Sequence, residues 1–508
     1  MTQTQFLLLF ISIIPLFNCL IQKLCTESNK LTNFTNKLLP ILFSANLVGL
    51  LGNMKYDNSY ITIFEAARGM SLGFYVDETA VAFLFLLNFL WIIFTFYSNR
   101  FLYLYKGNLD INNFKIFFLL IVSFLNLIII SKNLLSILFF YNCLIFICHF
   151  FAVKFLHKKE GKYSNIFTLL LYLESIFFFL AIVATYKFTG VIDFTKDGIL
   201  SSISTNNFNE GKCTILLFLY LSGLFLSILI PSYLLYRNIN FDPLVIYALF
   251  FLGYAFSSLF IFTKLLIFIF GFSDFSFIIS NIGFSYFELI FLVNLLISGS
   301  LMLFCKNLKS LFFYLLLNQF ILTLFTIFVF AIYDPSKVYL ALFSFLLSLT
   351  LIFLCISNLV LYINRSGKSS IEGLFHDLKI SSSLLAFAVL NLIGIAPALG
   401  AVQMFFIIKI LIKKKLLLAG IIYTINFVTL IFFSFRLLYP LYLKPQKPED
   451  KKLLAEFEKS EKINKEIAKE IAREIDFDSG LILTATVTSI LMFLLLFLFP
   501  LLIKFLNI

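Results

Sequence analysis

The ten residues from 392 to 401 read LIGIAPALGA, and they interrupt an apolar run that is long enough to cross a membrane. Gly394, Pro397 and Gly400 all weaken a helix, because glycine is conformationally free and proline lacks the N–H that a helix interior needs. A break within a bilayer frees backbone polar groups, which are tolerated where protein or water satisfies them. The stretch therefore predicts a discontinuous helix beside a polar cavity, with a simple proline kink as the alternative.

The overall composition is that of a membrane protein. The chain has 508 residues, of which 61% are hydrophobic and 13% are charged. A bilayer core needs about 20 apolar residues per helix, and charged or turn-rich interruptions divide the chain into about fourteen such runs. We therefore predict an all-α polytopic membrane protein with about fourteen transmembrane helices.

The formal net charge of +12 does not indicate a nucleic-acid partner, because the basic residues lie in short loops, where they orient helices. Loops 154–163 and 304–309 carry several lysines each. They predict the cytoplasm-like face, with both termini on the opposite side.

The chain shows no cofactor or metal motif. Its seven cysteines include no C-x-x-C pair, its three histidines are dispersed, and no Gly-rich phosphate loop is present. We therefore expect no redox chemistry in this chain itself. Heavy use of Phe (70 residues) and scarce Gly (20) and Trp (1) are typical of an AT-rich coding sequence, which favours an organelle-encoded gene.

A second proline interrupts an apolar run at Pro231, within SGLFLSILIPSYLLY. NLLSILFFY (133–141) is also echoed by NLKSLFFY (307–314). Broken helices at matching positions are typical of transporters built from two inverted repeats. We therefore predict two inverted five-helix repeats with two discontinuous helices, and these divisions: N-terminal helices at 1–113, a first repeat at 114–270, a second repeat at 271–440, a charged segment at 441–479 and a C-terminal helix at 480–508.

The charged segment between 446 and 479 has i,i+4 pairs such as Glu458 with Lys462, together with a narrow apolar stripe. These features predict a helix. It is either a solvated helix along the membrane surface or a docking helix for a neighbouring subunit.

Ordered motifs resemble one family. They are FYVDETAVAF (74–83), SKNLLSILFFYN (131–142), CKNLKSLFFYLLLNQ (305–319) and IEGLFHDLKISSSLLAF (371–387) followed by LIGIAPALG. This series is similar to NADH dehydrogenase subunit 2, an antiporter-like membrane subunit of respiratory complex I. Subunits 4 and 5 and free-standing cation/proton antiporters share the architecture, but helix 337–363 lacks the H-A-x-x-K-A pattern of the sister subunits.

The resemblance implies a subunit of a proton-translocating NADH:ubiquinone reductase in the mitochondrial inner membrane. Its implied partners are subunits 4, 5, 4L and 6, accessory subunits and membrane phospholipid. Within that family a line of protonatable residues crosses the membrane midplane.

Four positions of that line carry neutral residues here. Asn142 stands at the glutamate of the family's fifth helix, Ser227 and Met404 stand at lysines of the two broken helices, and Gln319 stands at a histidine of the tenth. We therefore predict a weakened, rerouted or abolished proton path, and a mainly structural scaffold is the alternative.

Five ionisable residues within or beside apolar runs are candidate proton carriers, because burying such groups in a membrane is costly. Each has a structural alternative, such as a snorkelling cation, a buried ion pair or a hydrogen-bonded histidine. Lys264 also resembles the lysine of the family's eighth helix, and either glutamate is a possible partner for it. The candidates are Lys264, Glu174, Glu288, His149 and Lys409.

Overall fold

The structure is a computed structural model, and its description covers residues 3–25, 29–53, 60–67, 70–104, 111–155, 161–195, 198–202, 210–226, 243–271, 284–304, 308–366, 372–395, 398–443 and 469–505.

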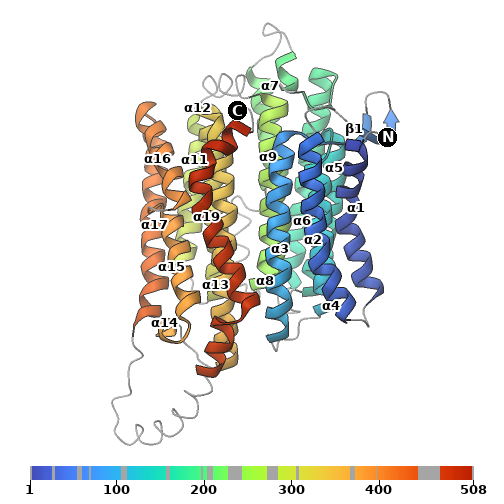
Figure 1. The fold of residues 1–508 in the computed structure, drawn as a ribbon. Coiled ribbons are helices and arrows are strands. Elements are labelled where there is room, and N and C mark those ends of the chain that lie inside the picture. The colour runs from blue at the N-terminus through green and yellow to red at the C-terminus, as the bar shows by residue number, and fades with distance from the viewer. Residues whose placement is uncertain are drawn as a thin grey trace, which may run out of the picture.

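The described chain forms a bundle of roughly parallel helices in two groups (Figure 1). The first group consists of α1 (Gln3–Leu24), α2 (Asn29–Asn53), α3 (Glu78–Leu104), α4 (Ile111–Ile129), α5 (Leu134–Phe155), α6 (Gly161–Thr189), α7 (Glu210–Phe225) and the helix at 243–270. That last helix comprises α8 (Pro243–Ile246), the π-helical η4 (Tyr247–Phe256), α9 (Ser257–Leu265) and the π-helical η5 (Leu266–Phe270).

The second group consists of α11 (Phe284–Phe304), α12 (Leu308–Tyr333), α13 (Val338–Ser366), α14 (Leu374–Asp377), α15 (Lys379–Ile393), α16 (Leu399–Lys413) and α17 (Leu417–Tyr442). Short 3-10 turns lie at η2 (Ile199–Ser202) and η6 (Pro335–Lys337). The last helix, α19 (Ser479–Phe505), returns against α3 and α13 and so contacts both groups.

Eleven helices of the described ranges are long and apolar enough to cross a membrane. Apolar runs of this length become helices in lipid because only a helix satisfies every backbone polar group within its own segment. The predicted all-α polytopic class is confirmed. The start of α1 and the end of α19 lie at the same end of the bundle (Figure 1).

A two-stranded antiparallel hairpin, β1 (Tyr60–Ala67) and β2 (Met70–Tyr75), lies at that same end. It is fixed to the turn between α4 and α5. The Tyr75 N–H donates to the Ile130 carbonyl at 2.8 Å, and the Lys132 N–H donates to the Gly73 carbonyl at 3.0 Å.

Stacked aromatic rings join the two groups at the centre of the bundle. Tyr247 of η4 stacks with Phe94 of α3, at 5.3 Å between ring centroids, and with Phe353 of α13, at 4.2 Å. The helix at 243–270 and α13 are accordingly buried along almost their whole length. Side chains on these two helices are therefore shielded from lipid, and polar groups on them need partners within the protein.

Candidate functional site

The stretch LIGIAPALGA contains a true helix break. Helix α15 ends at Gly394, whose φ of 85° favours glycine, and the N–H of Ile395 donates back to the Leu390 carbonyl at 3.0 Å. Helix α16 begins at Leu399. The interruption predicted from the sequence is confirmed, although Pro397 itself lies outside the described residues.

Asn391 fastens the two halves of this broken helix together. Its side-chain oxygen accepts the Gly400 N–H at 2.8 Å, which satisfies one of the free donors at the start of α16. A Cβ at position 400 would lie only 2.0 Å from the Asn391 carbonyl oxygen, so the close approach requires glycine.

A small polar cavity lies against this break. It has a volume of about 20 Å³, which is enough for about one water molecule. The structure brings Gln319 and Met404, two of the neutral positions, together in its wall. The full lining is Gln319, Leu322, Thr323, Ser344, Phe345, Ser348, Asn391, Leu392, Gly400, Gln403, Met404 and Tyr423. No carboxylate, lysine or histidine is among these residues, so tyrosine is the only titratable type present.

In the first group, a carboxyl group lies at the end of α7. Glu174 of α6 is fully buried, and its Oε1 lies 2.7 Å from the Tyr254 hydroxyl oxygen of η4. The same hydroxyl oxygen lies 2.7 Å from the Leu224 carbonyl in the last turn of α7. Three helices therefore converge on one buried hydroxyl group.

Two glycines permit this convergence. A Cβ at Gly223 would lie 2.7 Å from the Phe178 nitrogen of α6, and one at Gly253 would lie 2.9 Å from the Cys148 sulfur of α5. Each glycine immediately precedes a member of the cluster, namely Leu224 or Tyr254. The lack of a side chain thus allows α7 to approach α6 and η4 to approach α5.

The π-helical form of η4 also belongs to this site, because π-helical turns widen a helix and are frequent at functional sites. Ser257 and Ser258 follow directly, and their hydroxyls donate to the Tyr254 carbonyl at 2.9 and 2.8 Å. These side-chain bonds occupy a carbonyl at the end of the π-helical segment.

Helix α5 contributes Tyr141 to this region. Its ring is buried, and its hydroxyl interacts electrostatically with Glu174. Asn142, the residue matched to the family's glutamate, is instead exposed. The inward-facing position at this level of α5 is therefore tyrosine, one residue before the matched one.

Lys264 is buried in α9, close to the end of the bundle that carries the hairpin. Its Nζ donates to the carbonyls of Ile129 at 3.1 Å and Ser131 at 3.0 Å, where α4 ends. The rings of Phe194 and Phe260 lie 5.2 and 5.7 Å from the amine. A cation is stabilised at a helix C-terminus by free carbonyls and the helix dipole. These acceptors are carbonyls and not Glu174.

Asp77 is the carboxylate that acts electrostatically on Lys264. It caps α3 by accepting the Ala80 N–H at 2.6 Å. Burial, together with the carboxylates of Asp77 and Glu78, raises the pKa of the nearby Tyr75 hydroxyl, which therefore stays neutral.

The remaining candidates are spread over the bundle. His149 of α5 is half-buried beside the ring of Tyr172, at 6.1 Å between centroids. Lys409 is exposed on α16 and does not line the polar cavity. Glu288 lies on α11, but its side chain is outside the described part of the structure, as are Ser227 and Pro231.

The described end of the charged segment packs against its own chain. Ile475 in the helical stretch 469–476 is fully buried, and Asp476 accepts the N–H groups of Ile380 at 2.9 Å and Ser381 at 3.1 Å. This carboxylate therefore caps the first turn of α15, the leading half of the broken helix.

Two ion pairs hold the same stretch. Glu474 binds Arg365 of α13 at 2.7 Å, and Asp478 binds Arg100 of α3. Residues 469–478 thus contact α3, α13 and α15, whereas 446–468 lie outside the described residues.

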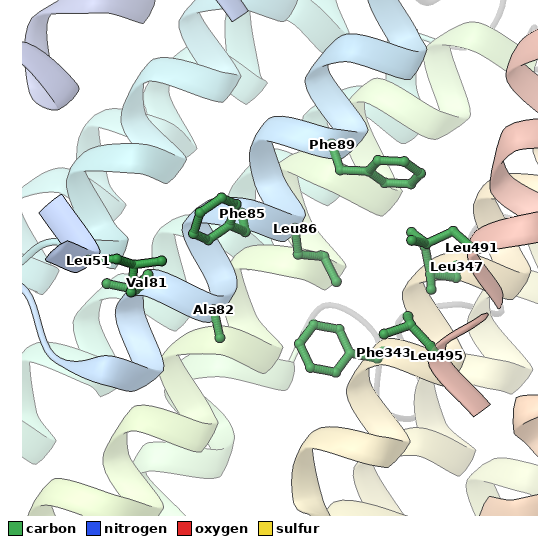
Figure 2. Close-up of a pocket in the computed structure, with 10 residues that line it drawn as sticks. All are labelled: Leu51, Val81, Ala82, Phe85, Leu86, Phe89, Phe343, Leu347, Leu491 and Leu495. Atoms are coloured by element: carbon green, nitrogen blue, oxygen red, sulfur yellow. The ribbon is translucent and has the colours of Figure 1, made fainter. Parts of the chain in front are cut away.

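A larger cavity of about 430 Å³ opens between α2, α3, α13 and α19 (Figure 2). Its lining carries only hydrocarbon side chains, namely Leu51, Val81, Ala82, Phe85, Leu86, Phe89, Phe343, Leu347, Leu491 and Leu495. Figure 2 shows Leu86 and Phe89 of α3 facing the residues of α13 and α19 across the gap. Such a cavity can hold a hydrocarbon chain but cannot carry a proton.

Comparison with known proteins shows the fold. No family model and no curated protein matches the chain. The chain is similar in structure to a chain of the Mrp complex from Dietzia sp. DQ12-45-1b, with a TM-score of 0.73 and 14% identity, covering 100% of this chain and 96% of that chain. It is also similar to a chain of the membrane-bound sulfane sulfur reductase, an archaeal respiratory membrane complex, with a TM-score of 0.67 and 14% identity, covering 96% and 99%. The predicted antiporter-like fold is therefore confirmed over the whole chain.

Proposed function

We propose that this chain is an antiporter-like membrane subunit of a proton-translocating respiratory complex, and that it is the subunit 2 component of mitochondrial NADH:ubiquinone oxidoreductase. The order of the motifs quoted above and the match of fold along the whole chain support this assignment. The partners are then subunits 4, 5, 4L and 6, accessory subunits and phospholipid of the mitochondrial inner membrane. Electron transfer takes place in other subunits.

The observation that carries a transport role is the cluster of Glu174, Tyr254 and the Leu224 carbonyl. It places a titratable group fully inside the bundle, at the end of α7. Buried ionisable groups at membrane depth are costly, and they are typical of proton paths. In this proposal the first group of helices carries the proton step, with Lys264 nearer one membrane face.

The polar cavity at the break between α15 and α16 favours a structural role for the second group. Its wall contains Gln319, Met404 and Asn391 where a relay needs groups that gain and lose protons, and its volume has room for about one water molecule. The scaffold alternative therefore applies to the second group of helices in particular. The second group holds the membrane arm together and conducts no protons.

Proton translocation per NADH oxidised, measured in membrane vesicles containing the assembled complex, tests the transport role. Glu174→Gln removes the titratable group with little change of shape, and we expect a partial fall in the ratio at normal assembly. Lys264→Ala gives a second measurement of the same path. Lys409→Ala is the matched control, because this lysine is exposed and outside the cavity. An unchanged ratio in both Glu174→Gln and Lys264→Ala, at normal assembly, would leave only the scaffold function.

A further inference from the structure

We propose that Asp77 is the residue with which Lys264 exchanges its proton, through a bound water molecule that the Tyr339 hydroxyl also holds. Asp77 belongs to the motif FYVDETAVAF, and nothing in the sequence alone gives it a chemical role. The inference rests on the proposed function and deepens it, because it names the group on the other side of the Lys264 proton step.

The backbone brings the start of α3 close to the amine of Lys264. Lys264 donates to the two carbonyls that flank Ile130, and the Ile130 carbonyl itself accepts the Tyr75 N–H at 2.8 Å. Asp77 follows Tyr75 by two residues and stands directly before α3. The hairpin and the turn between α4 and α5 therefore fix Asp77 beside the acceptors of Lys264.

Aromatic contacts hold the same helices together. Phe83 of α3 packs against Phe260 of α9, at 4.7 Å between ring centroids, and against Tyr339 of α13, at 6.2 Å. Phe260 lies about one helical turn before Lys264. The first turns of α3 therefore contact both the helix that carries the amine and the helix that carries the Tyr339 hydroxyl.

The charges at this end of the bundle leave Asp77 as the carboxylate for Lys264. Lys132, the lysine of the turn between α4 and α5, already binds Asp193, with 3.1 Å between its Nζ and Oδ2. Asp77 acts electrostatically on both Lys264 and Tyr339. A buried cation is costly unless an opposite charge faces it, and Asp77 supplies that charge.

Three polar groups here are incompletely bonded within the described part of the chain. Asp77 accepts the Ala80 N–H and the Thr79 hydroxyl with Oδ1, whereas its Oδ2 is buried without a hydrogen-bond partner. The Tyr339 hydroxyl lies near that of Thr79 but outside hydrogen-bond geometry, and it is buried as well. Lys264 has three N–H donors and directs two to carbonyls. A buried water molecule binds two to four polar groups, and these three meet that need.

The proton step balances within this site. The Lys264 ammonium gives a proton to the water molecule, which passes one to Asp77 Oδ2. The products are a neutral amine, water and a neutral carboxylic acid, and the reverse step restores both charges. Asp77 stands just before a helix that can cross the membrane, whereas Lys264 is inside one that ends at Phe270. Asp77 is therefore placed to pass the proton to the membrane face at the hairpin end.

A double-mutant cycle on thermal unfolding of the purified full-length chain tests the charge pair. Asp77→Asn keeps an oxygen for the cap of α3 and removes the charge, and Lys264→Met keeps an unbranched side chain and removes the amine. Each single substitution leaves one charge without its partner, so each should lower the unfolding temperature. The double variant should lose less than the sum of the two single losses.

Asp193→Asn is the matched control for the cycle, because Asp193 binds Lys132. Its loss should add to that of Lys264→Met. Additive losses for Asp77→Asn and Lys264→Met, or an equal coupling in the Asp193 cycle, would overturn the inference. This measurement does not depend on proton pumping.

Proton translocation per NADH oxidised, in vesicles containing the assembled complex, tests the exchange itself. We expect Asp77→Asn to lower the ratio as much as Lys264→Met, and the two together to lower it no further, because they remove the two ends of one step. A normal ratio in Asp77→Asn beside a lowered ratio in Lys264→Met would overturn the inference and leave the proposed function in place. A normal ratio in both of these and in Glu174→Gln would overturn the proposed function, and the exchange with it.

Tyr339→Phe tests the water site, because it removes one of the three polar groups. We expect a partial fall in the same ratio. Tyr423→Phe is the control, since it removes a buried hydroxyl that binds Thr326 beside the break between α15 and α16, and it should leave the ratio unchanged. Equal ratios in the two variants would exclude Tyr339 from the exchange site.

Discussion

Gly400 shows how a single missing side chain fixes the helix break. The Asn391 carbonyl occupies the place that a Cβ would take, so Gly400→Ala must displace one half of the broken helix. We expect a loss of roughly 1–3 kcal/mol of stability from this overpacking. Thermal unfolding of the purified protein in detergent measures it.

The control for this substitution is Gly420→Ala. A Cβ at position 420 meets nothing within 4 Å, and the residue is inside α17. We expect unchanged or slightly raised stability there, because alanine favours a helix over glycine. Equal stabilities of the two variants would contradict the steric account of position 400.

Single residues were predictable from the sequence where a residue type conflicts with its surroundings. Glu174 and Lys264 are charged types in apolar runs, and Gly394 and Gly400 are helix-weakening types in a helix. Tyr254 conflicts with nothing, because tyrosine is ordinary in an apolar segment. Its importance arises from the Leu224 carbonyl and Glu174, which only the folded chain brings to it.

Helix α15 depends on a cap from a distant part of the chain. Asp476 accepts two N–H groups of its first turn and the Ser381 hydroxyl, the latter at 2.8 Å. Asp476→Ala should therefore lower the stability by about 1 kcal/mol, as loss of a helix cap does. Thermal unfolding measures this change, and Glu470→Gln, at an exposed site on the same stretch, should have no effect. Equal unfolding temperatures of Asp476→Ala and the unmodified protein would exclude the cap as a stabilising contact.

Helices and strands were predictable from the sequence where the residues within the segment itself determine its structure. The break between α15 and α16 follows from glycine and proline in an apolar run. The hairpin β1–β2 and the π-helical η4 were missed for opposite reasons. The hairpin depends on hydrogen bonds to the α4–α5 turn, and the residues of η4 are typical of an ordinary apolar helix.

The proposed function makes this chain a subunit of a larger complex and not a free-standing transporter. The chain should then copurify in stoichiometric amounts with the quinone-reducing subunits after mild solubilisation. Quantitative mass spectrometry of the isolated complex measures this ratio. Recovery of the chain alone, with active cation/proton exchange in vesicles, would favour the free-standing antiporter instead.

The fold as a whole was predictable because hydrophobic length determines membrane helices almost unaided. The residues that would carry protons were less predictable from the sequence. Four positions matched to proton carriers hold Asn142, Ser227, Gln319 and Met404, and a residue-by-residue match cannot show which neighbour replaces them. On α5 the buried side chain is Tyr141, one place away from the match. Which residue of a helix faces inward depends on its packing against other helices, and the sequence of that helix alone does not determine it.

The stretch 469–478 has a consequence for how the molecule unfolds. Its carboxylates reach α3 in the first group and both α13 and α15 in the second, so it acts as a noncovalent cross-link between them. Groups of helices joined in this way should unfold together, because opening one group breaks contacts of segment 469–478 that also stabilise the other group. Cooperativity between the two groups of helices is thus supported by a short segment that directly precedes α19.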